Sequence, residues 1–172
     1  NEGDSSLLEI RSEVMDADIY GKFNYSEIPA SLVNLTSYYL PALTGKDSLK
    51  KTNVPGDKSD LTYSLRLKKM ANLVRFFTRE YFISDSTYIS GKYNPSDHDV
   101  SLTAVVPAIG YKNKTWKDLY FIAEADSNLI EYTGVSGHIA FNKDLGIDNF
   151  RFSGLLSNDT ITTAIHWQSP GK

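Results

Sequence analysis

The sequence predicts a mainly β protein: an antiparallel meander that curls into a half-barrel or groove, of the kind called a β-taco, with two short amphipathic helices. Apolar and polar residues alternate with a period of two along most of the chain. Tyrosine is common, at 11 of 172 residues, and threonine, valine and isoleucine recur in the alternating runs. These residue types favour strands. Turn-forming triplets separate the later runs at short, regular intervals, as in a meander.

The first expected element is a hairpin. An alternating run that contains Leu8 and Ile10 is followed by a second run over residues 17–23, with a turn near residues 14–16. Further strands are expected at residues 61–67, 100–106, 116–126, 129–141, 147–156 and 160–168. The triplets between the last four are too short for the crossovers that parallel strands need, so we expect antiparallel pairing.

Two segments have a helical period instead. The first is expected at residues 27–40, with Ser26 as N-cap and Pro41 as the stop. The second contains apolar residues at helical spacing, which are Met70, Leu73, Val74 and Phe77. Residues 44–59 show no period and are expected to form a flexible linker. We therefore expect a hairpin-plus-helix unit at 1–43 and a helix-plus-meander unit at 60–172.

A short internal repeat links the two units. Residues 19–27 are echoed by residues 89–97, with five identical positions. The shared motif consists of Gly21, Lys22 and Asn24 in the first copy and Gly91, Lys92 and Asn94 in the second. A glycine inside a strand indicates a bulge or a close backbone approach, and Asn followed by Ser suits the turn that ends the strand. The repeat indicates duplicated strand-rich units that stack on each other.

The bulk composition narrows the function classes. With 41% hydrophobic residues, 23% charged residues and a formal net charge of -3, the chain is an ordinary globular protein and not a nucleic-acid binder. Cysteine is absent, which excludes disulfides, thiolate nucleophiles and cysteine-rich metal sites. The chain begins at Asn1 without a signal-peptide pattern, and it has no apolar run of membrane-spanning length. We expect a soluble fragment of a larger protein.

Four segments, at residues 10–23, 38–41, 86–93 and 107–111, together resemble the bacterial TamB family in its Bacteroidetes-like form. This family is part of the translocation and assembly module. The resemblance implies a periplasmic protein, anchored in the inner membrane through other parts of the parent chain, whose β-sheet forms a long apolar groove. It also implies a role in lipid transfer and outer-membrane assembly, with phospholipid acyl chains and an outer-membrane BamA-like barrel as partners. The family has no catalytic residues or cofactor to carry over.

A groove of this kind has a simple physical purpose. Exposing an acyl chain to water costs about 0.8 kcal/mol per CH₂, or roughly 12 kcal/mol for a common fatty tail, and an apolar trough removes most of that cost. The candidate lining residues are Val100, Leu102, Ala104, Val106, Leu119, Phe121, Ala123, Ile139, Phe141, Phe150, Phe152, Ile161 and Ile165. The same pattern suits faces that close on each other as a dry core.

Other residue clusters are less informative. The run at residues 97–99, Asp-His-Asp, lacks a second histidine at metal-ligand spacing, so we expect a solvated turn and no metal. His138 and His166 lie in separate strands without a serine elbow, and we expect surface histidines. Glu124 and Asp126 share one strand face, as in a polar outer surface. No catalytic centre is expected.

Two surfaces leave alternatives open. Basic residues gather near Tyr63 and Phe76, where they could meet lipid phosphate or nucleic acid or remain solvated; they are Arg66, Lys68, Lys69 and Arg75. Trp116 and Trp167 could stack on sugars, which would make the chain a carbohydrate- or protein-binding β-sandwich module of a secreted or surface protein. Each tryptophan also fits a strand end in a sheet.

Overall fold

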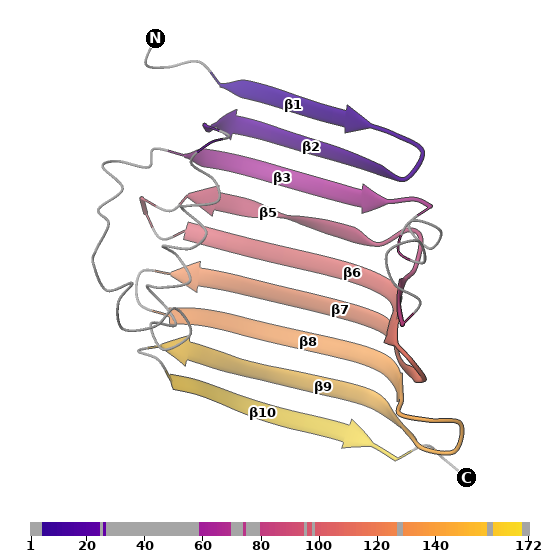
Figure 1. Ribbon diagram of the computed structural model, residues 1–172. Coiled ribbons are helices and arrows are strands. Elements are labelled where there is room, and N and C mark those ends of the chain that lie inside the picture. Colours follow the sequence, from indigo (N-terminus) through magenta and orange to yellow (C-terminus); the bar gives the residue numbers. More distant parts are fainter. Residues whose placement is uncertain are drawn as a thin grey trace.

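The computed structural model describes residues 5–24, 26, 59–69, 74, 80–94, 96–97, 99–126, 129–157 and 160–169. These residues form one open antiparallel sheet (Figure 1). Its ten strands are β1 (Ser6–Arg11), β2 (Met15–Lys22), β3 (Asp60–Leu67), β4 (Tyr81–Ile83), β5 (Tyr88–Asn94), β6 (Asp99–Tyr111), β7 (Lys114–Asp126), β8 (Leu129–Ala140), β9 (Gly146–Ser157) and β10 (Thr160–Gln168).

The predicted antiparallel meander is confirmed. From β5 to β10 each strand pairs with the next along the chain, and β1, β2 and β3 continue the same sheet on the other side of β5. The expected strand at 160–168 is β10, and the expected turn near residues 14–16 joins β1 to β2. The short strand β4, which the alternation pattern does not predict, pairs with the far end of β6.

The N-terminal hairpin and the meander share this sheet, because β2 pairs with β3 from Met15 opposite Leu67 to Lys22 opposite Asp60. The expected helix at residues 27–40 lies outside the described residues, and of the second helix only Val74 is described. The expected linker also lies outside them, apart from Ser59. The division into two units therefore stays a prediction.

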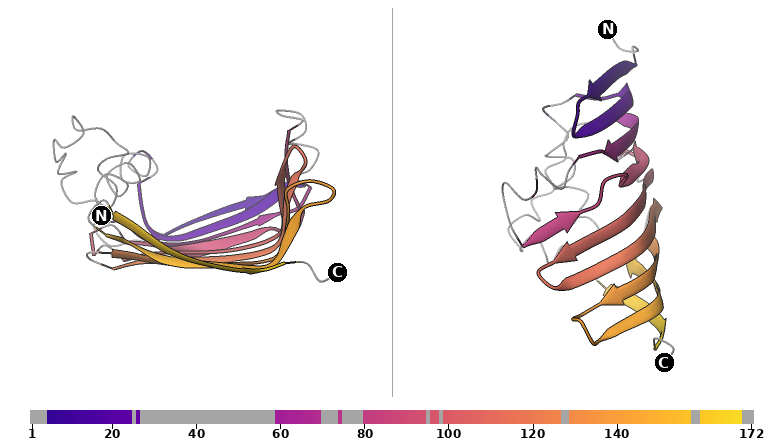
Figure 2. Two further views of the ribbon diagram at one scale, coloured as in Figure 1. Left: turned by 90° about the horizontal axis from the view of Figure 1, so that it is seen from below. Right: turned by 90° about the vertical axis from the view of Figure 1, so that its right-hand side faces the viewer.

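The sheet is bent, so that it has a concave and a convex side (Figure 2). A row of unusual residues crosses strands β6 to β9, because the register places Pro107 opposite Asp118, Asp118 opposite Gly137, and Gly137 opposite Asn149. Asp118 and Asn149 have φ angles of 52° and 49°, in the left-handed region that interrupts a regular strand. We place the bend of the sheet at this row.

The alternation of side chains changes phase at the same row. In β7, strict alternation would put Trp116 and Phe121 on opposite sides of the sheet. The Trp116 ring nevertheless contacts the Phe150 ring at 5.7 Å, Phe150 contacts Phe152, and Phe152 stacks on Phe121. All four rings therefore lie on one side, and the left-handed residue at Asp118 is what allows it.

We expect Asp118 to tolerate glycine but not a β-branched residue. Asp118→Val forces a branched side chain into a left-handed conformation and should lower the free energy of unfolding by about 1–2 kcal/mol. Asp118→Gly removes that steric cost and should stay within about 0.5 kcal/mol of wild type. Urea unfolding followed by circular dichroism measures both. Equal losses for the two variants would contradict a conformational role for this position.

Candidate functional site

The most distinctive feature of the sheet is a continuous apolar surface on one of its sides. Directly opposed residues of an antiparallel pair share a face. The register joins one such row across nine strands, formed by Ile10, Ala17, Leu65, Ile89, Ala104, Phe121, Gly134, Phe152 and Ile165. With strands about 4.8 Å apart, the row runs for roughly 40 Å.

Parallel rows on the same side extend this surface, which we call the apolar face. Its further residues are Leu8, Met15, Ile19, Leu61, Tyr63, Leu67, Gly91, Tyr93, Val100, Leu102, Val106, Leu119, Ala123, Ile130, Tyr132, Phe150, Leu156 and Ile161. None of them carries a charge.

The apolar face is the concave side of the sheet. Trp116 and Phe150 come from opposite sides of the bend and still touch, which is possible only inside the corner. Buried hydrophobic side chains also lie on this side, with Ile139 at 1%, Leu61 and Tyr93 at 5% and Val106 at 6% exposed. The bent sheet therefore has an apolar inner surface.

The structure brings most of the predicted lining residues onto this face. Val100, Leu102, Ala104, Leu119 and Phe121 are half-buried there. Phe150 and Phe152 lie beside them in ring contact, at 5.7 Å between centroids. Their side chains are therefore neither sealed in a core nor fully exposed.

Four other residues of the predicted lining are more buried or more exposed than this half-buried group. Ile139 lies past the bend and is almost completely buried, so it packs inside the corner. Phe141 follows the end of β8 and is 38% exposed. Ile161 and Ile165 lie on the edge strand β10 and are 59% and 50% exposed. The apolar face is thus closed at the corner and open at the β10 edge.

Aromatic side chains lie flat over glycines of the neighbouring strand on this face. A Cβ added to Gly134 would come within 2.2 Å of the Phe152 ring, and one added to Gly154 within 2.5 Å of the Tyr132 hydroxyl. The Tyr63 ring covers Gly91 in the same way and its hydroxyl donates a hydrogen bond of 3.1 Å to the Ser101 carbonyl. These pairs give a smooth aromatic surface, a feature that the glycine positions alone could have indicated.

In both copies of the repeated motif the asparagine side chain accepts hydrogen bonds from the residues that follow it, although the backbone donor differs. The side-chain oxygen of Asn24 accepts hydrogen bonds from the backbone N–H and the hydroxyl of Ser26. The side-chain oxygen of Asn94 accepts them from the Ser96 hydroxyl and the Asp97 backbone N–H. The prediction that this asparagine forms the turn after the strand is confirmed. Lys22 is exposed, whereas Lys92 pairs with Asp99 at 2.5 Å.

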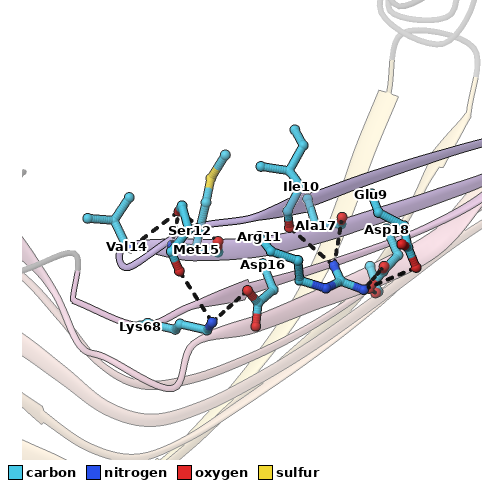
Figure 3. Close-up of polar contacts among 11 residues, drawn as sticks. Glu9, Ile10, Arg11, Ser12, Val14, Met15, Asp16, Ala17, Asp18 and Lys68 are labelled. Atoms are coloured by element: carbon cyan, nitrogen blue, oxygen red, sulfur yellow. Dashed lines mark hydrogen bonds and ion pairs between the residues drawn. The ribbon is translucent and has the colours of Figure 1, made fainter.

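The opposite, convex side is mixed in character. It carries ion pairs near β1 and β2 (Figure 3), and it also exposes single large apolar side chains such as Leu7, Val105 and Leu155. Arg11 pairs with Asp18, and Lys68 pairs with Asp16 at 2.6 Å between Nζ and Oδ1. Figure 3 shows Ile10 on the other side of the strands from Asp16 and Lys68. The hydrogen bond from Lys68 holds the pKa of Asp16 below its ordinary value, and the partner Asp99 raises the pKa of Lys92.

Part of the predicted basic cluster is therefore neutralised. Lys68 is bonded to Asp16, and Lys69 lies 3.6 Å from Glu13. Arg66 stands opposite Asp16 in the ladder between β2 and β3. Arg75 lies outside the described residues. These pairs leave little net positive charge on this part of the convex side.

A hollow of about 660 Å³ lies at one end of strands β6, β7 and β8, and many of the side chains that line it are acidic. Its polar lining consists of Asp97, Asp99, Ser101, Glu124, Asp126 and Glu131. No group of three potential metal ligands occurs within the part of the chain that the structure describes, and His98 lies outside that part. The hollow is solvated carboxylate surface with Lys92 at its side.

The histidines have separate environments. Nδ1 of His138 lies 2.5 Å from the Asp148 carboxylate, in a pair that sequence reasoning missed because ten residues separate the partners. His166 is exposed on β10. Trp116 packs against Phe150, whereas Trp167 is 58% exposed. The two tryptophans therefore do not form a common flat platform.

No described helix has the length and apolar character that crossing a membrane would require. No family model, curated protein or solved structure matches the chain.

Proposed function

We propose that this chain is a non-enzymatic module of a Gram-negative cell envelope that holds phospholipid acyl chains on its apolar face, as part of a TamB-like protein. The observation that carries the proposal is the uncharged apolar surface that follows the concave side of an open sheet from β1 to β10. This surface is roughly 40 Å long. The hydrocarbon core of a bilayer is about 30 Å thick, so the acyl chains of one leaflet span about half of that thickness. An extended acyl chain therefore fits along this surface.

The energetics favour an acyl ligand over a polar one. Each CH₂ that leaves water contributes about 0.8 kcal/mol, so a tail laid across several strands gains many kcal/mol before the cost of immobilisation. The phenyl rings of Phe121, Phe150 and Phe152 offer flat contact surface without donors or acceptors. In the proposed module, periplasmic location and outer-membrane biogenesis follow from the TamB-like segments of the sequence.

The alternative of a sugar-binding module has less support. Stacking on a sugar needs an aromatic ring face open to solvent, whereas Trp116 is half-buried and in a T-shaped contact with Phe150, at 72° between the ring planes. Of the two tryptophans only Trp167 is exposed, and it lies on the edge strand β10.

Adjacent residues of β7 allow a matched test of the lipid proposal. Phe121 is on the apolar face, whereas its neighbour Tyr120 is on the convex side and 43% exposed. Phe121→Asp places an uncompensated charge where the tail would lie and should weaken binding of a fluorescent fatty acid by about tenfold or more. Leu102→Asp should act in the same way, and Tyr120→Asp should leave binding unchanged.

Native mass spectrometry of the purified protein gives a second readout. Wild type and Tyr120→Asp should carry co-purified phospholipid, and Phe121→Asp should carry much less. The absence of lipid from wild type in both assays, or an equal loss in Tyr120→Asp, would refute the proposed use of the apolar face.

A further inference from the structure

Strand β10 is the least covered element of the sheet. All nine of its residues are exposed, including Ile161 at 59%, Ile165 at 50% and Trp167 at 58%. One edge of β10 is hydrogen-bonded to β9. Along its other edge no strand of the described residues is paired. Within the described residues, the apolar face therefore reaches β10 with large side chains in water, which is unfavourable for an isolated monomer.

The composition of β10 lacks the features that normally protect an edge strand. Its sequence, Thr-Ile-Thr-Thr-Ala-Ile-His-Trp-Gln, has no lysine, arginine, acid or proline and is rich in β-branched residues. Natural sheets block unwanted pairing with charges, prolines or inward-pointing polar groups. The other edge strand, β1, has such charges in Glu9 and Arg11, which are paired with each other at 3.4 Å. Of the two strands at the ends of the described sheet, β1 and β10, the edge of β10 is therefore the better suited to accept a strand.

We propose that this edge pairs with β10 of a second copy of the chain, antiparallel and about a two-fold axis at Thr163. In this register Ile161 of one copy opposes Ile165 of the other, and Thr163 opposes itself. Isoleucine pairs and Thr–Thr pairs are favourable neighbours across antiparallel strands. The register brings no like charges together, because β10 contains no lysine, arginine, aspartate or glutamate.

The alternation of side chains along β10 makes the apolar face continuous across the dimer. Ile161, Thr163 and Ile165 share the apolar face within one chain, since they oppose Leu156, Gly154 and Phe152 of β9. The two-fold pairing keeps all six residues of the two strands on one side. The closed two-fold symmetry stops the assembly at two copies, whereas pairing of β10 with β1 would lead to an open-ended series. The dimer joins the two apolar faces and covers the exposed isoleucines of both.

Sedimentation velocity in lipid-free and detergent-free buffer tests the proposal independently of any lipid binding. Wild type should show a monomer–dimer equilibrium. Ile161→Lys with Ile165→Lys places like charges opposite each other twice and should weaken the dimer by about tenfold or more. Leu7→Lys, on the exposed outer side of β1, is the matched control and should leave the dimer intact.

A charge-swapped variant tests the register. Ile161→Lys with Ile165→Glu removes the same apolar side chains but sets opposite charges across the two-fold axis, so dimerisation should return relative to the double lysine variant. Circular dichroism should show unchanged β structure for all variants. A monomeric wild type, a mass above dimer that Leu7→Lys abolishes, or no recovery in the charge-swapped variant would overturn the proposal.

Discussion

Replacing Gly91 by alanine is expected to lower the free energy of unfolding by about 3 kcal/mol. A Cβ at this position would lie 1.9 Å from the Ser101 carbonyl oxygen and 2.5 Å from the Tyr63 hydroxyl. The first of these neighbours is backbone of the adjacent strand, so it can move only if the ladder between β5 and β6 opens. Tyr63 would also be displaced from its hydrogen bond to that carbonyl.

Gly137→Ala provides the comparison for this prediction. It is also a strand glycine, but its added Cβ would meet the Asp118 side chain, at 3.0 Å from Oδ2, and that side chain can turn away. We expect its unfolding free energy to stay within about 1 kcal/mol of wild type, by urea titration at one temperature. Equal stability of Gly91→Ala and Gly137→Ala would show that β5 and β6 do not approach each other so closely at Gly91 in solution.

The sequence predicts the strands well because their alternation is a local property. Residues 61–67 and 160–168 show period two by themselves, and both are strands. The close backbone approach predicted for Gly91 is confirmed, because a single glycine within an alternating strand is typical of a bulge or of such an approach. Local patterns thus predict the elements and the face that each residue occupies up to the bend.

The bend could not be predicted in this way. It depends on Pro107, Asp118, Gly137 and Asn149 lying side by side, and only the cross-strand register reveals that alignment. Strict alternation would place Trp116 on the convex side, but the left-handed residue at Asp118 returns it to the apolar face. A signal was present in the sequence: turn-type residues occur at one level within four long strands.

The bend also divides the apolar residues into two kinds that the sequence does not distinguish. Before the corner, Leu102 and Phe121 are half-buried and can be reached by a ligand. Inside the corner, side chains from both arms of the sheet close on each other, as the Trp116 and Phe150 rings do. The apolar pattern is the same in both regions, so only the geometry separates an accessible apolar surface from a packed core.

Ile139 gives the clearest test of this division. It is 1% exposed, so Ile139→Ala removes three carbon atoms from a closed site and should lower the free energy of unfolding by about 3 kcal/mol. Urea unfolding followed by circular dichroism measures this loss. Fatty-acid binding by the folded variant should remain close to wild type, because Ile139 holds the corner together and offers no surface to a ligand.

Ile109→Ala is the control, since Ile109 belongs to the same cross-strand row and is 37% exposed. It should cost about 1 kcal/mol, because a side chain already in water loses less transfer free energy and leaves no cavity. Equal losses in the two variants would mean that the corner is not closed in solution. Weaker fatty-acid binding in folded Ile139→Ala would instead make Ile139 part of the ligand surface, and the boundary between core and groove would then lie beyond the bend.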